Sequence, residues 1–138
     1  MEDNTMTKRE TIINALEVLG YKPQVDSDGD IYLYYQLKAI YVLETRQEDS
    51  NYLAVVLPLF YEMKEGEEVK TLAACNKATR ELRQIKVFVD STLKDVTASC
   101  EFYYCDEQCL RSQLERSLDY LGKIRTVFKN YMTEFDEE

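Results

Sequence analysis

The spacing of the apolar residues alternates between helical and strand periods along this chain, and that alternation restricts the folds it can adopt. Apolar positions three or four residues apart predict a first helix, which Thr7 and Glu10 cap and Gly20 ends. Branched and tyrosine-rich runs then predict strands over residues 31–36 and 39–45. The first part of the chain is therefore expected to pack one helix against a hairpin.

The alternation continues in the middle of the chain. The hairpin tip is expected at Leu37-Lys38, and a nearly continuous apolar run over residues 52–60 predicts a third strand. Helical spacing returns from residue 69 to about residue 83. Period-two spacing then predicts a second hairpin that starts at Ile85 and includes Phe102. The strands are therefore expected in two groups separated by a helix.

The longest periodic segment is the last one. Asp106 can cap a helix whose apolar positions recur in steps of three or four as far as Met132. At ~1.5 Å per residue this helix would span about 40 Å, which is long enough to brace a whole sheet. The order α-β-β-β-α-β-β-α predicts an α+β fold, with a mostly antiparallel sheet and helices packed on it in a single domain over residues 1–138.

Charge and composition exclude several kinds of partner. The chain has 17 basic and 26 acidic side chains and a net charge of −9, which repels nucleic-acid phosphates and anionic membranes. The first residues are acidic where a secretory signal is basic, and no apolar run is long enough to span a membrane. We therefore expect a cytoplasmic protein whose four cysteines are reduced.

Several short segments carry a resemblance to a known family. They are Leu19-Gly20-Tyr21 leading into Gly29-Asp30-Ile31, Leu57-Pro58, Ala74-Cys75-Asn76 ahead of Lys86-Val87-Phe88-Val89, and the close of the last helix from Phe128 to Met132. With these segments the chain resembles, over nearly its full length, the YbjN family, whose members are described as candidate bacterial sensory transduction regulators. The resemblance implies a fold like that of type III secretion chaperones. It also implies a role in binding or regulation, with no catalytic residue to carry over.

An acidic run between two predicted extended segments begins like a calcium-binding loop. Asp26, Asp28 and Asp30 alternate as the first ligands of such a loop do. However, Ile31 stands where glycine is needed, and Leu37 stands where a bidentate glutamate belongs. Aspartate and glycine are also typical of tight turns. We therefore interpret the run as a polar turn and predict neither a metal nor another cofactor.

Cysteines are the remaining candidates for chemistry, because the chain contains no histidine. Cys105 and Cys109 lie four residues apart at the predicted start of the last helix, where the helix dipole can lower the pKa of a thiol; Cys100 precedes them. Zinc sites usually use closer cysteine pairs or histidine, and a nucleophile needs a nearby base. The chain is therefore expected not to be an enzyme, with a thiol-dependent enzyme or metal site at Cys105 and Cys109 as an alternative.

Basic residues gather on the predicted middle helix of this acidic chain. They are Lys70, Lys77, Arg80, Arg83 and, just beyond the helix, Lys86. Such a stripe is either a docking surface for an acidic partner or an ordinary solvated helix face.

The best candidate for a binding surface is an aromatic face of the predicted sheet. Alternation puts Tyr32 and Tyr34 on one face of their strand, and Tyr41 continues that face in the next strand. Phe60 and Tyr103 are expected to extend it. Either this face is exposed and binds a partner, or helices cover both faces of the sheet.

The expected function follows from this aromatic surface. We expect a non-enzymatic protein-binding or regulatory domain that receives a peptide or a second subunit on the tyrosine-rich face. A symmetric homodimer is the expected assembly, because two copies would cover such a face. A chaperone of the type III secretion kind, dedicated to one client protein, is the alternative within the same class.

Overall fold

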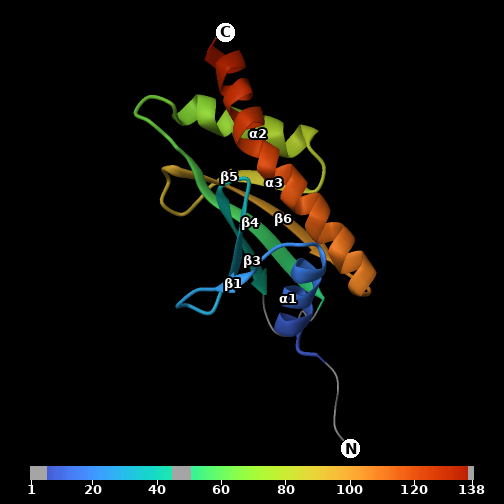
Figure 1. Ribbon diagram of the computed structural model, residues 1–138. Coiled ribbons are helices and arrows are strands. Elements are labelled where there is room, and N and C mark those ends of the chain that lie inside the picture. The colour runs from blue at the N-terminus through green and yellow to red at the C-terminus, as the bar shows by residue number, and fades with distance from the viewer. Residues whose placement is uncertain (1–5, 45–50, 137–138) are drawn as a thin grey trace, which may run out of the picture.

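A computed structural model describes residues 6–44 and 51–136 of the chain. An antiparallel sheet carries three helices on one of its sides (Figure 1). The elements are α1 (Lys8–Val18), β1 (Gln24–Val25), β2 (Ile31–Tyr35), β3 (Lys38–Glu44), β4 (Tyr52–Glu62), α2 (Glu68–Glu81), β5 (Ile85–Val89), β6 (Asp95–Tyr103) and α3 (Glu107–Asp136). The predicted α+β class and order are confirmed, with the short strand β1 added ahead of the first hairpin.

Local signals set most of these boundaries. The Thr7 hydroxyl accepts a hydrogen bond from the amide of Glu10 and so caps α1 as predicted. The hairpin tip, by contrast, lies one residue earlier than predicted. Tyr35 pairs with Lys38, and the two residues between them have φ values of 50° and 66°. The tip is therefore a two-residue turn with both residues left-handed, which matches the twist of the strands. The predicted strand end at Thr45 lies outside the described residues.

The sheet has the strand order β1-β2-β3-β4-β6-β5. Both hairpins pair locally, and β4 joins them by pairing with β6 along most of its length. The register between β4 and β6 shifts between Leu57 and Tyr61, where Leu59 has a φ of 53°. This irregularity is a bulge that interrupts the alternation of side chains between Leu57 and Tyr61.

The core lies between the sheet and the helices. All three helices contribute to one cluster of buried side chains with one face of the sheet, and α3 packs against both α1 and α2 (Figure 1). The apolar stripe of α3 is buried as predicted, with Phe128 among its fully buried members. Ile12 and Leu16 from α1 and Ala74 and Ala78 from α2 join the same cluster. The helices therefore cover a single face, and the alternative of helices on both faces is wrong.

Helix α2 also protects an edge of the sheet. β5 is the last strand on its side, so one row of its backbone groups has no strand partner. The hydroxyl of Thr79 on α2 accepts a hydrogen bond from the amide of Val87 at 2.9 Å and donates one to the carbonyl of the same residue at 3.2 Å. One side chain therefore satisfies both outward backbone groups of Val87.

A glycine allows the first hairpin to approach α3. A Cβ atom added to Gly122 would lie 2.7 Å from Cε1 of Tyr35 and 2.9 Å from Oε1 of Gln36. The glutamine end can rotate away, but the tyrosine ring is rigid and packs against the core. Gly122 is therefore a position where the absent side chain matters for packing.

Replacing Thr79 tests the protected edge. Thr79→Val keeps the shape but removes the hydroxyl, so the backbone amide and carbonyl of Val87 lose their partner. We expect the free energy of unfolding, measured by urea titration, to fall by about 1–3 kcal/mol. Thr79→Ser, which keeps the hydroxyl, is the matched control and should lose clearly less. Equal losses in the two variants would contradict the proposed role of the hydroxyl.

A double-mutant cycle tests the contact between Gly122 and Tyr35. In the Tyr35→Ala background, Gly122→Ala should raise the free energy of unfolding by up to about 1 kcal/mol, because alanine favours a helix more than glycine does. In the wild-type background the same change should lower it, because overpacking typically costs about 1–3 kcal/mol. Urea unfolding of the four proteins gives the coupling. The same effect in both backgrounds would show that the close approach does not constrain the fold.

Candidate functional site

The face of the sheet opposite the helices is the main candidate surface. Strand pairing puts five side chains side by side across it, one from each of five strands. From β2 to β5 they are Tyr32, Tyr41, Val56, Ser99 and Lys86. Their sequence neighbours, such as Ile31, Val55 and Ala98, are buried in the core on the other side. We call this helix-free surface the open face.

Three tyrosines form a cluster at the β2–β3 end of the open face. The ring of Tyr32 lies 5.9 Å from that of Tyr34 in an edge-to-face arrangement and 5.7 Å from that of Tyr41. The Tyr32 hydroxyl also donates to Oε1 of Gln24 at 2.9 Å. The side chain of Tyr34 is 63% exposed. The cluster is therefore a fixed aromatic surface, and the sequence prediction for these tyrosines placed them together correctly.

A second aromatic pair lies on β4 and β6. The ring of Tyr103 is 4.8 Å from that of Tyr52, and Tyr103 is 65% exposed. Tyr103 belongs to the open face as predicted, because the neighbouring Phe102 points into the core. The open face thus has exposed aromatic rings on the β2–β3 side and again on β6.

A polar group lies on the open face beside this second pair. Glu101 accepts hydrogen bonds from Lys86, Tyr52 and Ser99, and Nζ of Lys86 lies 2.7 Å from Oε2 of Glu101. Burial acts to raise the pKa of Glu101, but these donors outweigh it and hold the pKa below its usual value. Glu101 therefore stays ionised on the open face.

Phe60 does not extend the open face, so this part of the prediction is wrong. The bulge at Leu59 turns Phe60 toward the helices, where its ring meets that of Phe128 at 5.4 Å and 88°. The next residue, Tyr61, packs on the same phenylalanine at 5.2 Å. Two consecutive residues thus face the same side, which simple alternation along a strand cannot predict.

Sequence reasoning also missed two exposed leucines near the tyrosine cluster. Leu37 is fully exposed at the hairpin tip, and Leu59 is 58% exposed at the bulge. Both have positive φ values, which leucine rarely adopts. No residue pattern signals such leucines, because turn positions of this kind normally hold glycine, asparagine or aspartate.

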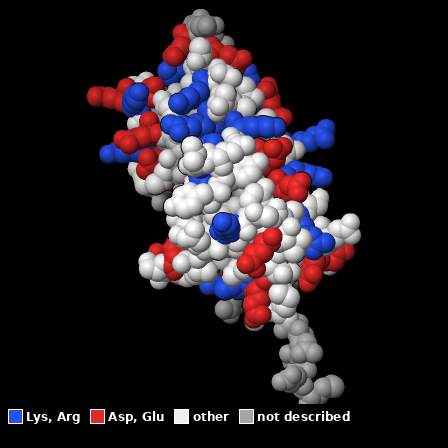
Figure 2. Space-filling model, in the orientation of Figure 1, with Lys and Arg blue, Asp and Glu red and all other residues white. Residues whose placement is uncertain are grey.

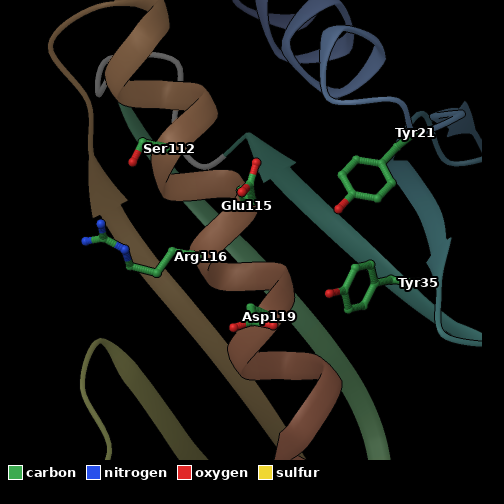
Figure 3. A pocket seen from close by; sticks show the side chains of 6 residues that line it. All are labelled: Tyr21, Tyr35, Ser112, Glu115, Arg116 and Asp119. Carbon is green, nitrogen blue, oxygen red and sulfur yellow. The ribbon is translucent and has the colours of Figure 1, made fainter.

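A separate polar groove of about 670 Å³ lies between α3 and the first hairpin (Figure 3). Tyr21 and Tyr35 form the wall opposite α3, and the centroids of their rings lie 5.9 Å apart. Their hydroxyls point toward the acidic side chains of α3. Burial, helped by Tyr35 and by the charges of Glu115 and Asp119, raises the pKa of Tyr21. The phenol of Tyr21 is therefore a protonated hydrogen-bond donor at neutral pH, which does not suit it to act as a base.

Three of the four thiols have a raised pKa and are therefore not activated. A hydrogen bond with Cys109 and the charge of Asp106 raise the pKa of the exposed Cys105, which is opposite to the lowering that the helix start suggested. Burial raises the pKa of Cys75 to about 11 and that of Cys100 to about 12. A raised pKa leaves little thiolate at neutral pH, and the thiolate is both the nucleophile and the metal ligand.

The acidic run before β2 forms a turn, as interpreted from the sequence. One carboxylate oxygen from each of Asp26, Asp28 and Asp30 lies within 4.8 Å of the others. Oδ1 of Asp26 accepts hydrogen bonds from the amides of Asp28 at 3.0 Å and Asp30 at 2.9 Å. Gly29 has a φ of 85°, which this turn requires. These hydrogen bonds account for the position of Asp26 in the turn.

The basic stripe on α2 is largely used within the chain. Lys70 forms an ion pair with Asp136 at 2.5 Å, and Lys77 forms one with Glu134 at 2.5 Å while its ammonium lies over the ring of Tyr131. Figure 2 shows the basic side chains gathered over α2 with acidic side chains among them, and few charges in the middle of this view. These two lysines therefore hold the end of α3 and are not free to dock a partner.

Comparisons with known proteins support the fold. No family model matches the chain, and no curated protein matches it by sequence. Among solved structures, the crystal structure of YbjN from E. coli matches with a TM-score of 0.64 and 12% identity, over 87% of each chain; that protein is described as a candidate transcription regulator. No helix in the described parts of the chain is long and apolar enough to cross a membrane. The chain therefore has a YbjN-like fold, as the resemblance implied.

Proposed function

We propose that this chain is a non-enzymatic protein-binding domain with a regulatory role, and that the open face is its contact surface. The observation that carries the proposal is the exposed tyrosine cluster on a sheet face that none of the described helices covers. Exposed apolar surface of this kind is typical of interaction sites. The described role of YbjN as a candidate transcription regulator is consistent with regulation through binding.

The chemistry of the open face suits a protein partner. Tyrosine offers a large contact area and a polar hydroxyl with few rotatable bonds, so little conformational freedom is lost on binding. The ring contacts of Tyr32 already restrict the cluster before any partner arrives. The ion pair of Lys86 with Glu101 adds a polar element that a partner must match.

Two observations favour binding over catalysis. The chain has no histidine, which is the usual general base near neutral pH. The raised pKa of Cys105 opposes the alternative of a thiol-dependent enzyme at Cys105 and Cys109. Both observations weigh against a cysteine nucleophile activated by a histidine base.

A second copy of the chain is the partner that we propose for the open face. Two-fold symmetry lets the same surface contact itself, so one exposed aromatic face suffices for a closed dimer. An antiparallel arrangement would place the tyrosine cluster of one copy near the Tyr52–Tyr103 pair of the other. Each copy would then shield the exposed rings of its partner from water.

Tyrosine replacements test this assembly. Tyr34→Ser and Tyr103→Ser each remove an exposed ring without touching the core, and each should weaken dimerisation about tenfold or more, as replacement of a central interface residue does. Light scattering across a concentration series measures the effect. Val69→Ser is the matched control, because Val69 is 82% exposed on α2, away from the open face.

The possible outcomes separate the proposals. A wild-type protein that stays monomeric at high micromolar concentration would refute the homodimer. If that monomer captures one client protein through Tyr34, the chaperone alternative is favoured over self-association. If the chain does not self-associate and no partner depends on Tyr34 for binding, the open face has no function and the proposed function fails.

A further inference from the structure

Strands β3 and β4 separate at one end and leave a groove. Their pairing runs from Glu44 and Leu53 to Tyr41 and Val56, and beyond it residues 38–40 pair only with β2. Pro58 follows on β4 and has no amide hydrogen to donate to a neighbouring strand. The space that opens between the two strands has a volume of about 400 Å³. We call it the β3–β4 groove.

Most of the residues that line the groove are apolar or aromatic. Tyr41 of the open face and Phe60 of the helix-covered side both line it, together with the exposed Leu37 and Leu59. The two leucines have φ values of 66° and 53°, a conformation that costs a non-glycine residue about 1–2 kcal/mol. Strained residues of this kind cluster at functional sites. Here two large apolar side chains on left-handed backbone positions are exposed at one groove.

Among the described residues, the charged side chains that line the groove are both basic. Arg125 of α3 and Lys38 of β3 both reach it. Within the described residues neither forms an ion pair, and Lys38 makes only a long hydrogen bond of 3.4 Å to the carbonyl of Gln36. By contrast, Lys70 and Lys77 both pair closely with carboxylates. The groove is therefore locally positive, although the chain as a whole has a net charge of −9.

We propose that the β3–β4 groove binds a partner peptide segment in which an Asp or Glu side chain is flanked by large apolar residues. The carboxylate would meet Lys38 and Arg125, and the apolar neighbours would cover Leu37 and Leu59. This inference rests on the proposed protein-binding function and specifies the chemistry of the partner. A charged hydrogen bond beside apolar surface is stronger than the same bond in water. The groove is therefore expected to prefer peptides that have both a carboxylate and large apolar neighbours.

Selection of peptides by the full-length chain tests the proposal. A phage-displayed library of random twelve-residue peptides, selected on the immobilised protein, should become enriched in acidic residues next to Leu, Ile or Phe. Selection on the charge-reversed variant Lys38→Glu/Arg125→Glu should instead enrich basic residues. A fluorescently labelled peptide that was selected on the wild-type protein should bind the charge-reversed variant at least about tenfold more weakly than it binds the wild type. The reason is that its attractive contacts with Lys38 and Arg125 become repulsive.

Two controls make the result specific. Lys22→Glu/Lys94→Glu makes the same change in net charge at exposed positions outside the groove, and it should leave the peptide affinity unchanged. Leu59→Ser should weaken binding of the same peptide through lost apolar contact. Thermal unfolding followed by circular dichroism confirms that each variant is folded, which is expected because all of the replaced side chains lie at the surface.

Specific outcomes would overturn the proposal. An acidic bias that persists in the charge-reversed variant, or no enrichment of acidic residues at all, would refute it. Loss of the homodimer in Lys38→Glu/Arg125→Glu would show that a second copy, and not a separate partner, occupies the groove. Tyr103 lies on β6, outside the groove, so the Tyr103→Ser variant tests binding by the open face alone. A failure of the open face and a failure of the groove can therefore be told apart.

Discussion

The packing of α3 across one face of the sheet is the constraint on which the rest of this structure depends. Its apolar stripe is buried from Leu110 to Met132, and α1 and α2 complete the same layer on the same side. Because a single layer of helices covers only one face, the alternation of the strands sends the other set of side chains into solvent. On β2 and β3 those side chains include Tyr32, Tyr34 and Tyr41. The candidate binding surface is thus a direct consequence of where the longest helix lies.

Sequence reasoning succeeded where one local rule decides the outcome. The three-to-four spacing of α3 and the cap at Thr7 each depend on nearby residues, and both were predictable. Strand alternation placed Tyr32 and Tyr34 correctly for the same reason. The short strand β1 has two exposed residues and no apolar pattern, so no local signal could indicate it.

The failures occur where distant parts of the chain meet or where the backbone departs from its usual conformation. Lys70 finds its carboxylate partner 66 residues away on α3, and no spacing rule could identify that ion pair. The hydroxyl of Thr79 completes the backbone hydrogen bonding of the edge strand, and no residue spacing indicates that contact. Phe60 was misplaced because a leucine adopts a left-handed conformation just before it.

One bulge connects the core to the β3–β4 groove. The left-handed turn at Leu59 brings both Phe60 and Tyr61 against Phe128, and contact between these rings offsets the local strain. The same bulge and Pro58 end the pairing with β3 and so open the groove. Core packing therefore explains the backbone conformation, but it does not explain a leucine at this position. Asparagine or glycine would adopt the same φ with less strain and without exposing an apolar side chain. We therefore propose that a leucine occupies position 59 because its side chain contacts a partner.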